Sequence, residues 1–389
     1  MRNLESRLRS ARDQRGASMR RRDFLTRTLL APALGSLLPR PVSADQTIAG
    51  DPGPSGHLPR LVTALERHLP DWMSGAAVPG LGIAVVERGR VAWSRGFGVK
   101  DASLNTRVDK TTMFEAASMS KPVFAYVVMK LVELGVLSLD VPLTTYASSR
   151  FLEGDSRVQL MTARHVLSHT GGFQNWRSEK APLAIHFTPG SRHMYSGEGY
   201  NYLQTVTTQL LGEPFEAYMT KRLLKPFGMA SSRYVWNDQA ARLMARPHDA
   251  TRTAVERARS TESNVARYGS AGALLSTPVD YAKFLIEVIS PRPADAVRLK
   301  PESVREMLRP SVKLDKSEPP SSWALGWQIF HGPGRDFIYH GGDNRGFHCA
   351  AVGSVAGQSG YVAMTNGDGG VSVLRRILTL DVMQEFLSA

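Results

Sequence analysis

The segments of this chain that favour β-strands lie at its two ends, and the segments that favour helices lie mainly between them. Residues 81–87 and 91–97 are largely apolar runs around a turn at residues 88–90, which predicts a β-hairpin. Similar short runs predict four more strands towards the other end, at residues 323–330, 336–339, 347–352 and 360–365. We therefore expect one sheet that is assembled from both ends of the chain.

Helical periodicity marks the segments that flank or separate these strands. Apolar residues at helical spacing predict a helix over residues 54–70 and a closing helix over residues 371–387. Together with the strands, they indicate an α/β fold in which helices flank an antiparallel sheet and a mostly helical subdomain is inserted. We expect an α/β subdomain from residues 45–110 plus 262–389 and a helical subdomain from residues 111–261.

A single cysteine, Cys349, limits how such a fold can be stabilised. One thiol forms neither a disulfide within the chain nor a cysteine-rich zinc cluster. Hydrophobic residues make up 42% of the 389 residues and charged residues 21%, the balance of a folded globular protein rather than a disordered or fibrous one. A chain of this length buries a core large enough to fold without cross-links.

The first 44 residues have the pattern of an export signal. A basic region that ends in Arg21-Arg22-Asp23-Phe24-Leu25 precedes a short apolar stretch and a Val42-Ser43-Ala44 end. The paired arginines resemble the twin-arginine signal of bacteria, so we expect a periplasmic or secreted protein after cleavage near Ala44. Met1 and Met19 both fit as the start, and a disordered basic arm is the alternative interpretation. The apolar stretch is shorter than the ~20 residues that span a bilayer, so no stable membrane span is expected.

The formal charge of +13 is concentrated in that same segment. Residues 1–44 hold ten arginines against three acidic residues, whereas the rest of the chain holds 38 basic and 32 acidic residues. Apart from Arg20-Arg21-Arg22, no run of basic residues offers the concentrated stripe that binds phosphates. We therefore expect no nucleic-acid partner.

Ser118-Met119-Ser120-Lys121 begins a predicted helix, with Gly135 where the helix is expected to end. Ser118 and Lys121 then share one helix face. A serine hydroxyl becomes a strong nucleophile when a neighbouring base takes its proton, and an amine one turn away, with its pKa lowered by burial, is able to do so. By itself the spacing also fits an N-cap serine beside a solvated lysine.

Two further motifs follow this serine and lysine along the chain. Tyr195-Ser196-Gly197 lies in a glycine-rich loop before an apolar helix expected to begin near Leu203, and a tyrosine beside a lysine ammonium can have its pKa depressed and act as a general base. His340-Gly341-Gly342 comes just after the predicted strand at residues 336–339, where two glycines let a ligand approach the backbone. Each motif alone is typical of an ordinary loop.

In this order and at these intervals, the three motifs resemble those of the serine β-lactamase and penicillin-binding-protein family. They are most similar to its class C-like branch, which includes carboxylesterases and D-amino-acid peptidases. The resemblance covers about residues 58–389. Three stretches support it: residues 163–172 are similar to a turn between the first two motifs, residues 271–280 to the start of a helix after the insert, and residues 325–327 to the strand before the third motif.

The resemblance implies a β-lactamase/transpeptidase-like fold and a serine hydrolase that forms an acyl-enzyme. Ser118 would be the acylated nucleophile, and Lys121 would hold its proton network. Tyr195 would be the general base for acylation and would activate water for deacylation. The backbone N–H groups of Ser118 and Asp343 would form the oxyanion hole, which is often the largest single catalytic contribution. No cofactor and no metal is implied.

The substrate-binding positions implied by the resemblance are Gly197, His340, Gly341 and Gly342, and two of them depart from the family pattern. The second motif commonly ends in asparagine, whose amide contacts the substrate, and here the position is Gly197. The third motif often begins with lysine, and here it is His340, which is mostly neutral near pH 7. Both departures favour a small-molecule ester over a β-lactam, while a class C-like β-lactamase or a D-alanyl peptidase stays an alternative.

Two alternative functions from other classes of protein remain open. His165 and His169 stand four residues apart, with His186 and His193 nearby, which fits a zinc hydrolase, although the usual glutamate between them is missing. The same fold also serves as a non-catalytic penicillin-binding or sensor module. The sequence does not define the oligomeric state or the acyl and leaving groups.

Overall fold

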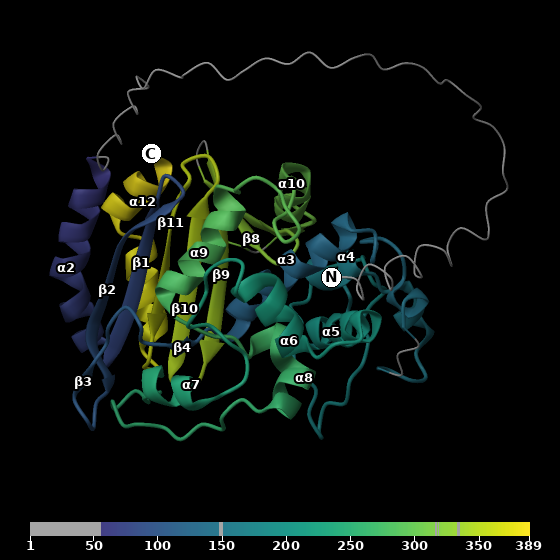
Figure 1. Cartoon of the computed structure of the whole chain (residues 1–389), viewed down its shortest axis with the longest axis horizontal. Helices are drawn as coiled ribbons and strands as arrows, with labels where there is room; N and C mark the ends of the chain where they lie inside the picture. Colours follow the sequence, from purple (N-terminus) through teal and green to yellow (C-terminus); the bar gives the residue numbers. More distant parts are fainter. Residues whose placement is uncertain (1–55, 148–150, 316, 318, 333–334) are drawn as a thin grey trace, which may run out of the picture. The chain divides into compact units, whose positions relative to one another are not determined.

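The computed structural model describes residues 56–147, 151–315, 317, 319–332 and 335–389. Residues His57–Ala389 form one compact unit, and the signal peptide expected over residues 1–44 lies outside the described residues. The unit is built on an antiparallel sheet of nine strands in the order β3-β2-β1-β11-β10-β9-β8-β7-β6, flanked by helices (Figure 1). The expected α/β fold with an antiparallel sheet is confirmed.

The strands come from the first and last thirds of the described chain. They are β1 (Gly80–Glu87), β2 (Arg90–Asp101), β3 (Thr106–Arg107), β6 (Val312–Leu314), β7 (Ser321–Trp323), β8 (Gln328–Gly332), β9 (Arg335–Asn344), β10 (Phe347–Ser354) and β11 (Ser359–Thr365). A separate two-stranded sheet pairs β4 (Phe114–Glu115) with β5 (Leu275–Ser276).

Helices surround and interrupt these strands. The α-helices are α2 (His57–Gly75), α3 (Ser120–Glu133), α4 (Ala163–Leu167), α5 (Gly197–Leu211), α6 (Phe215–Met219), α7 (Asp238–Leu243), α8 (Glu262–Gly272), α9 (Pro278–Ile289), α10 (Pro301–Leu308), α11 (Gly370–Leu378) and α12 (Asp381–Ser388). Short 3₁₀ turns are η2 (Ala117–Met119), η3 (Leu143–Thr145) and η4 (Ser156–Leu160), and η5 (Thr220–Leu224) is a π-helical turn. Among the described residues, no helix has both the length and the hydropathy to cross a membrane.

The two ends of the sheet meet at β1 and β11. Leu81 pairs with Thr365 and Val86 with Gly360, so the predicted N-terminal hairpin docks directly on the last strand of the chain. β1 is fully buried because it is covered on both faces, which explains why its sequence is a continuous apolar run rather than an alternating one. The sheet expected from both chain ends is therefore confirmed.

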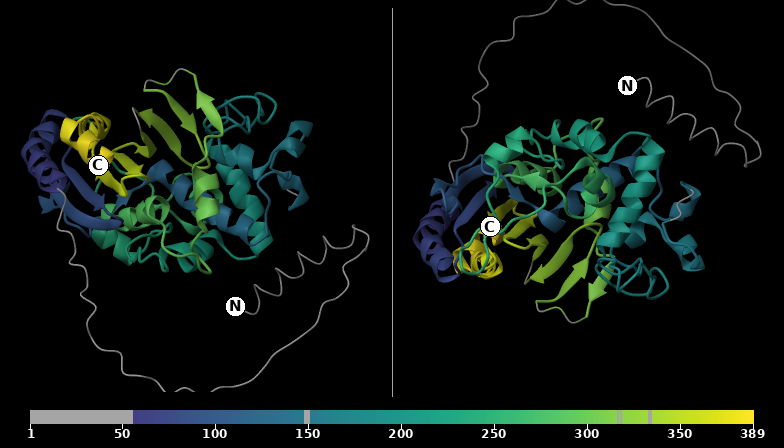
Figure 2. Two further views of the ribbon diagram at one scale, coloured as in Figure 1. Left: turned by 90° about the horizontal axis from the view of Figure 1, so that it is seen from above. Right: turned by 90° about the horizontal axis from the view of Figure 1, so that it is seen from below.

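The residues of β1 alternate between two helical layers. Leu81, Ile83 and Val85 point into a core shared with α2, α11 and α12, which cover one face of the sheet. Gly82 faces α9 on the other side, where a Cβ atom would lie 2.9 Å from the Pro278 ring. The glycine lets α9 approach the sheet closely. Figure 1 and Figure 2 show α2 and α12 at one end of the unit and α4 and α5 at the other.

Several predicted boundaries are wrong, each for a local reason. The first helix runs through Pro70 to Gly75 instead of ending at Pro70. The closing helix is two helices, because the chain turns at Thr379 and Leu380 between α11 and α12. The strand expected over residues 323–330 is also two strands, β7 and β8, since Gly326 adopts a left-handed φ of 90° in the turn between them.

Candidate active site

Ser118 lies in the 3₁₀ turn η2, at the point where the chain enters α3. The preceding residue, Ala117, has a φ of 46°, a left-handed conformation that a residue with a Cβ rarely adopts. The turn is held by Ser120, whose Oγ donates to the Ala117 carbonyl at 2.7 Å and accepts from the Leu274 N–H at 3.0 Å. A strained backbone that its surroundings fix in place is common at functional sites.

Lys121 reaches back along the first turn of α3 to Ser118. Its Nζ is 3.1 Å from the Ser118 Oγ and donates to the Ala271 carbonyl at 2.7 Å. The side chain is fully buried, and burial lowers the pKa of Lys121 from 10.5 to about 7. The expected serine–lysine pair is thus within hydrogen-bond distance, and the amine is neutral in a large fraction of molecules near pH 7.

Tyr195 lies over the same amine. The Lys121 Nζ is 4.9 Å from the centre of the Tyr195 ring. That ring packs against His169 in a tilted arrangement, with the ring centres 4.2 Å apart, and contacts Trp323 edge to face at 5.6 Å. Burial raises the pKa of Tyr195, and a hydrogen bond with Ser118 opposes the rise only in part. The pKa of Tyr195 is therefore raised and not depressed, because removal from water outweighs the hydrogen bond with Ser118.

The helix after Tyr195 begins earlier than the sequence suggested. α5 starts at Gly197 rather than near Leu203, since the Ser196 Oγ caps it by accepting from the Gly199 N–H at 2.9 Å. Gly197 is held by two contacts from Asn175: its N–H donates to the side-chain oxygen at 2.8 Å and to the carbonyl at 3.1 Å. Gly197 thus lies at the N-terminus of α5, beside the Tyr195 side of the site.

Trp176 covers Gly197 and is a site residue that the sequence analysis did not single out. A Cβ atom on Gly197 would lie 2.6–2.9 Å from three atoms of the Trp176 indole. The same ring is 5.9 Å from the Lys121 Nζ and contacts Tyr268 edge to face at 6.2 Å, while 46% of the residue stays exposed. The indole therefore occupies the space that a side chain at position 197 would need.

The third motif lies inside strand β9 rather than after it. Pairing of β9 with β8 ends at Tyr339, whereas pairing with β10 continues from Ile338 to Asn344, so residues 340–344 have one edge free of β8. Strand β9 passes beside η2, and a Cβ atom on Gly342 would overlap the Ala116 carbonyl oxygen. Glycine at position 342 thus brings the backbone around Asp343 next to the Ser118 turn.

His340 carries no charge in this site. Burial, aided by the Lys121 charge, lowers the pKa of His340 to about 3. Its Nδ1 is 2.7 Å from the Gly341 carbonyl, and its ring lies 5.7 Å from that of Trp323. A carboxylate of a substrate would find no cation at this position.

The four histidines considered for zinc are spread over different surroundings. His165 caps α4, His169 packs on Tyr195 and accepts from the Ser196 N–H at 3.0 Å, and His193 packs against Trp323. His186 is exposed. Within the part of the chain that the structure describes, no three His, Cys, Asp or Glu side chains group as a metal site would require.

A comparison with known protein families identifies the family of this chain. The family model described as Beta-lactamase matches residues 62–383 of the chain. The chain belongs to the β-lactamase family. The predicted resemblance to this family is thereby confirmed. The stretch at residues 325–327, expected in a strand, lies in the turn between β7 and β8.

Curated proteins that are similar to this chain include an esterase. Esterase EstB of Burkholderia gladioli is 28% identical over 185 residues, which cover 39% of this chain and 46% of EstB. Protein flp of Staphylococcus aureus (strain MRSA252) is 24% identical over 190 residues, which cover 44% of this chain and 37% of flp. The chain therefore spans less than half the length of either curated relative.

A solved structure from the family matches the fold more completely. The β-lactamase/D-alanine carboxypeptidase of Pseudomonas syringae superposes with a TM-score of 0.71, covers 83% of this chain and 99% of its own, and is 20% identical. At that identity the match establishes the β-lactamase-like fold alone.

Sequence reasoning missed the residues that enclose the site because no motif points to them. Trp176 follows the 163–172 turn by four residues, and Trp323 precedes the 325–327 stretch by two, so proximity to a matched stretch is the one signal in the sequence. Ala271 contributes only its backbone carbonyl to Lys121, which no side-chain pattern can reveal.

Proposed function

We propose that this chain is an exported serine hydrolase that works through an acyl-enzyme on a carboxylic ester. The observation that carries the proposal is the contact between the Lys121 Nζ and the Ser118 Oγ at 3.1 Å, in a buried position where the pKa of Lys121 is about 7. A neutral amine at hydrogen-bond distance is a base for the serine proton near neutral pH.

Acylation then proceeds with a balanced set of bond changes. The Ser118 Oγ attacks the ester carbonyl carbon, and its proton passes to the Lys121 amine. The backbone N–H groups of Ser118 and Asp343 hold the negative oxygen of the tetrahedral intermediate. The bond to the alkoxy oxygen breaks, that oxygen takes the phenolic proton of Tyr195, and the Lys121 ammonium returns a proton to Tyr195.

Deacylation repeats these steps with water in place of serine. Lys121 and Tyr195 together remove a proton from the water, which attacks the acyl carbon, and the Ser118 Oγ leaves with a proton. Tyr195 serves as a relay in both halves rather than as a standing phenolate, because its raised pKa keeps it protonated at neutral pH.

Two features of the site favour an ester over a β-lactam. The neutral His340 offers no cation for a substrate carboxylate, and Trp176 fills the space where an amide side chain at position 197 would stand. A site discriminates between substrates through its polar partners. Their absence therefore weakens the binding of a β-lactam, which carries an amide and a carboxylate, more than that of a simple ester. The 28% identity to Esterase EstB supports the same choice.

Labelling with a fluorophosphonate probe tests the nucleophile. We expect the wild-type protein to be labelled and to hydrolyse short-chain p-nitrophenyl esters, and Ser118→Ala to lose both properties. Undiminished labelling of Ser118→Ala would contradict the assignment. A chromogenic cephalosporin and D-alanyl peptides belong in the same panel, since faster turnover of either would favour the β-lactamase or peptidase alternative. Acylation without turnover would favour a penicillin-binding module.

Export and the subdomain division remain predictions within this proposal. We expect the joint replacement of Arg21 and Arg22 by lysine to leave the precursor in the cytoplasm. Unchanged delivery of that variant would contradict the twin-arginine route. The division at residues 111 and 261 predicts that the α/β and helical subdomains differ in hydrogen-exchange protection.

A further inference from the structure

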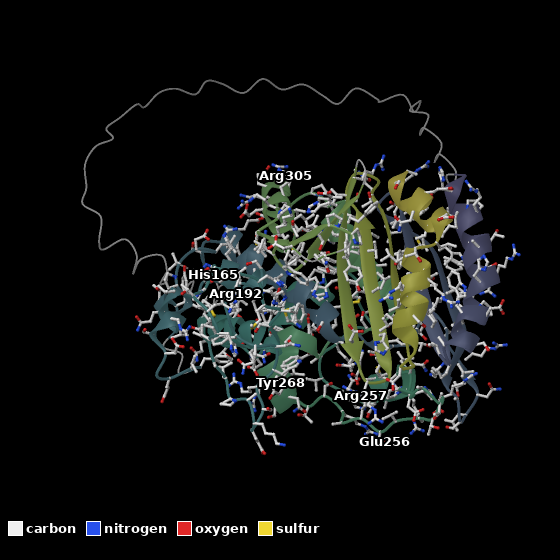
Figure 3. All side chains as sticks on the ribbon, turned by 180° about the vertical axis from the view of Figure 1, so that it is seen from behind. His165, Arg192, Glu256, Arg257, Tyr268 and Arg305 are labelled. Atoms are coloured by element: carbon white, nitrogen blue, oxygen red, sulfur yellow. The ribbon has the colours of Figure 1, made fainter. Side chains whose placement is uncertain are left out.

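A pocket of about 530 Å³ opens beside the Ser118 turn. Its wall combines aromatic and charged side chains from β4, the residues before α7, the loop between α7 and α8, and α8. Six residues define its character: Glu115, Trp236, Arg246, Arg257, Arg259 and Tyr268. In Figure 3, Tyr268, Arg257 and Glu256 follow one another along the lower edge of the unit. A larger cavity of about 890 Å³ lies between α6 and α8 and shares no lining residue with the site described above.

The pocket adjoins the reacting serine on more than one side. Gly272 lines it, and a Cβ atom there would lie 3.9 Å from the backbone carbon of Ala117, the residue before Ser118. Asn344 also lines it and directly follows Asp343 in β9. Its amide donates to the Glu115 carboxylate at 2.6 Å. The pocket thus begins at residues next to Ala117 and Asp343, which places it beside a carbonyl held at Ser118.

The position of Tyr195 decides which half of the substrate enters this pocket. Tyr195 supplies the proton for the leaving oxygen, and it lies among His169, Trp323 and His340. None of these four residues lines the pocket. The leaving group thus faces His169, Trp323 and His340, and the acyl group points towards the pocket.

Charge pairing in the wall leaves one guanidinium available. Arg257 pairs with the partly buried Glu115 at 2.9 Å, and Arg246 pairs with Glu256 at 2.7 Å. Arg259 instead lies over the Trp236 indole, 5.2 Å from the ring centre. Among the described residues, no carboxylate stands at ion-pair distance from Arg259. An exposed guanidinium fixed over an aromatic ring is well placed to bind a carboxylate with its free edge.

With the acyl group in this pocket, we propose that Arg259 selects acyl groups that end in a carboxylate. The proposal rests on the proposed esterase function and names its substrate class. The Trp236 and Tyr268 rings offer flat apolar walls for a planar or aliphatic segment between the ester carbonyl and the far carboxylate. The anion is thus recognised in the acyl pocket and not at His340.

Two p-nitrophenyl esters of matched size test this selection. One is the mono-ester of terephthalate, which ends in a carboxylate, and the other is the ester of terephthalamate, which ends in a neutral amide. We expect kcat/KM of the wild-type enzyme to be at least about 10-fold higher for the carboxylate, the scale of one charged hydrogen bond. Arg259→Gln should lower kcat/KM for the carboxylate ester more than for the amide ester and so bring the ratio close to one. Added salt should shrink the ratio, because the pocket is open to water.

A matched control and a binding measurement make the result decisive. Arg242→Gln removes an exposed arginine outside the pocket and should keep the wild-type ratio. Equal kcat/KM for the two esters, or an equal loss for both in Arg259→Gln, would overturn the proposal. If neither ester is hydrolysed, the proposed function fails, and calorimetry of Ser118→Ala with mono-benzyl terephthalate still decides the binding. Binding that Arg259→Gln weakens at least about 10-fold would support the pocket assignment, and binding that it leaves unchanged would refute it.

Discussion

Replacing Lys121 by methionine should make this protein more stable at pH 7 while it abolishes turnover. The amine is fully buried, and burial holds the pKa of Lys121 near 7 instead of 10.5. Folding at neutral pH must therefore either strip a proton from this lysine or bury a charge. Methionine has a similar unbranched shape and carries no such group.

The size of the effect follows from the two pKa values. The difference between 10.5 and about 7 corresponds to roughly 5 kcal/mol at about 1.4 kcal/mol per pH unit. Against this, the variant leaves the Ala271 carbonyl without its donor, at about 1–3 kcal/mol. We expect a net gain of about 2–4 kcal/mol at pH 7. Between pH 7 and 10.5 the unfolded chain binds the extra proton, so wild-type stability rises with pH and the advantage of the variant shrinks.

Urea denaturation of both proteins at pH 7, 8 and 9 measures the difference. Lys130→Met is the control on the same helix, because the Lys130 Nζ donates to Glu133 and to the carbonyls of Asp295 and Arg298. Removing that paired charge should cost about 3–5 kcal/mol. The reasoning is refuted if Lys121→Met is less stable than wild type at pH 7, or if its advantage is the same at all three pH values.

Four further outcomes concern the proton relay and the surroundings of Gly197 and His340. The kcat/KM for an ester should rise with pH through about 7 as Lys121 loses its proton, and Tyr195→Phe should lower kcat at least ~100-fold, so a flat profile or an active phenylalanine variant would contradict the relay. Gly197→Asn should destabilise the fold by about 1–3 kcal/mol because it collides with Trp176, and adding Trp176→Ala should remove most of that loss in a double-mutant cycle. Adding His340→Lys to that pair should raise the ratio of cephalosporin to ester turnover, and an unchanged ratio would show that neither position sets specificity.

Much of the fold could be predicted because each main strand is a separate apolar run in the sequence. The continuous apolar run Leu81–Val86 and the short runs near the end of the chain predict a sheet, and hydrophobic burial leaves few ways to join them. The order of the serine, tyrosine and histidine motifs likewise identified the family. The predicted element boundaries were wrong where a single turn ends a strand or helix, as at Gly326 between β7 and β8.

The electrostatics of the site could not be predicted, because burial is a property of the whole fold. Tyr195 follows Met194 and precedes Ser196, and nothing in that neighbourhood reveals that His169 and Trp323 exclude water from its ring. Trp176 over Gly197 is a contact between a loop and a helix start more than twenty residues apart in sequence. Such contacts fix the pKa values and the free space, and one sequence without its fold contains no measure of either.

The pairing of β1 with β11 sets the order in which the strands of the sheet can pair during synthesis. Leu81 pairs with Thr365, so the β1–β2 hairpin leaves the ribosome long before its other neighbour exists. Until β11 arrives, one edge of the apolar strand β1 has unpaired N–H and C=O groups, and such an edge recruits strands from other chains. Contacts this distant in sequence form late and slowly. Nascent chains that lose their last strand would therefore aggregate through β1 rather than fold into a smaller, inactive hydrolase.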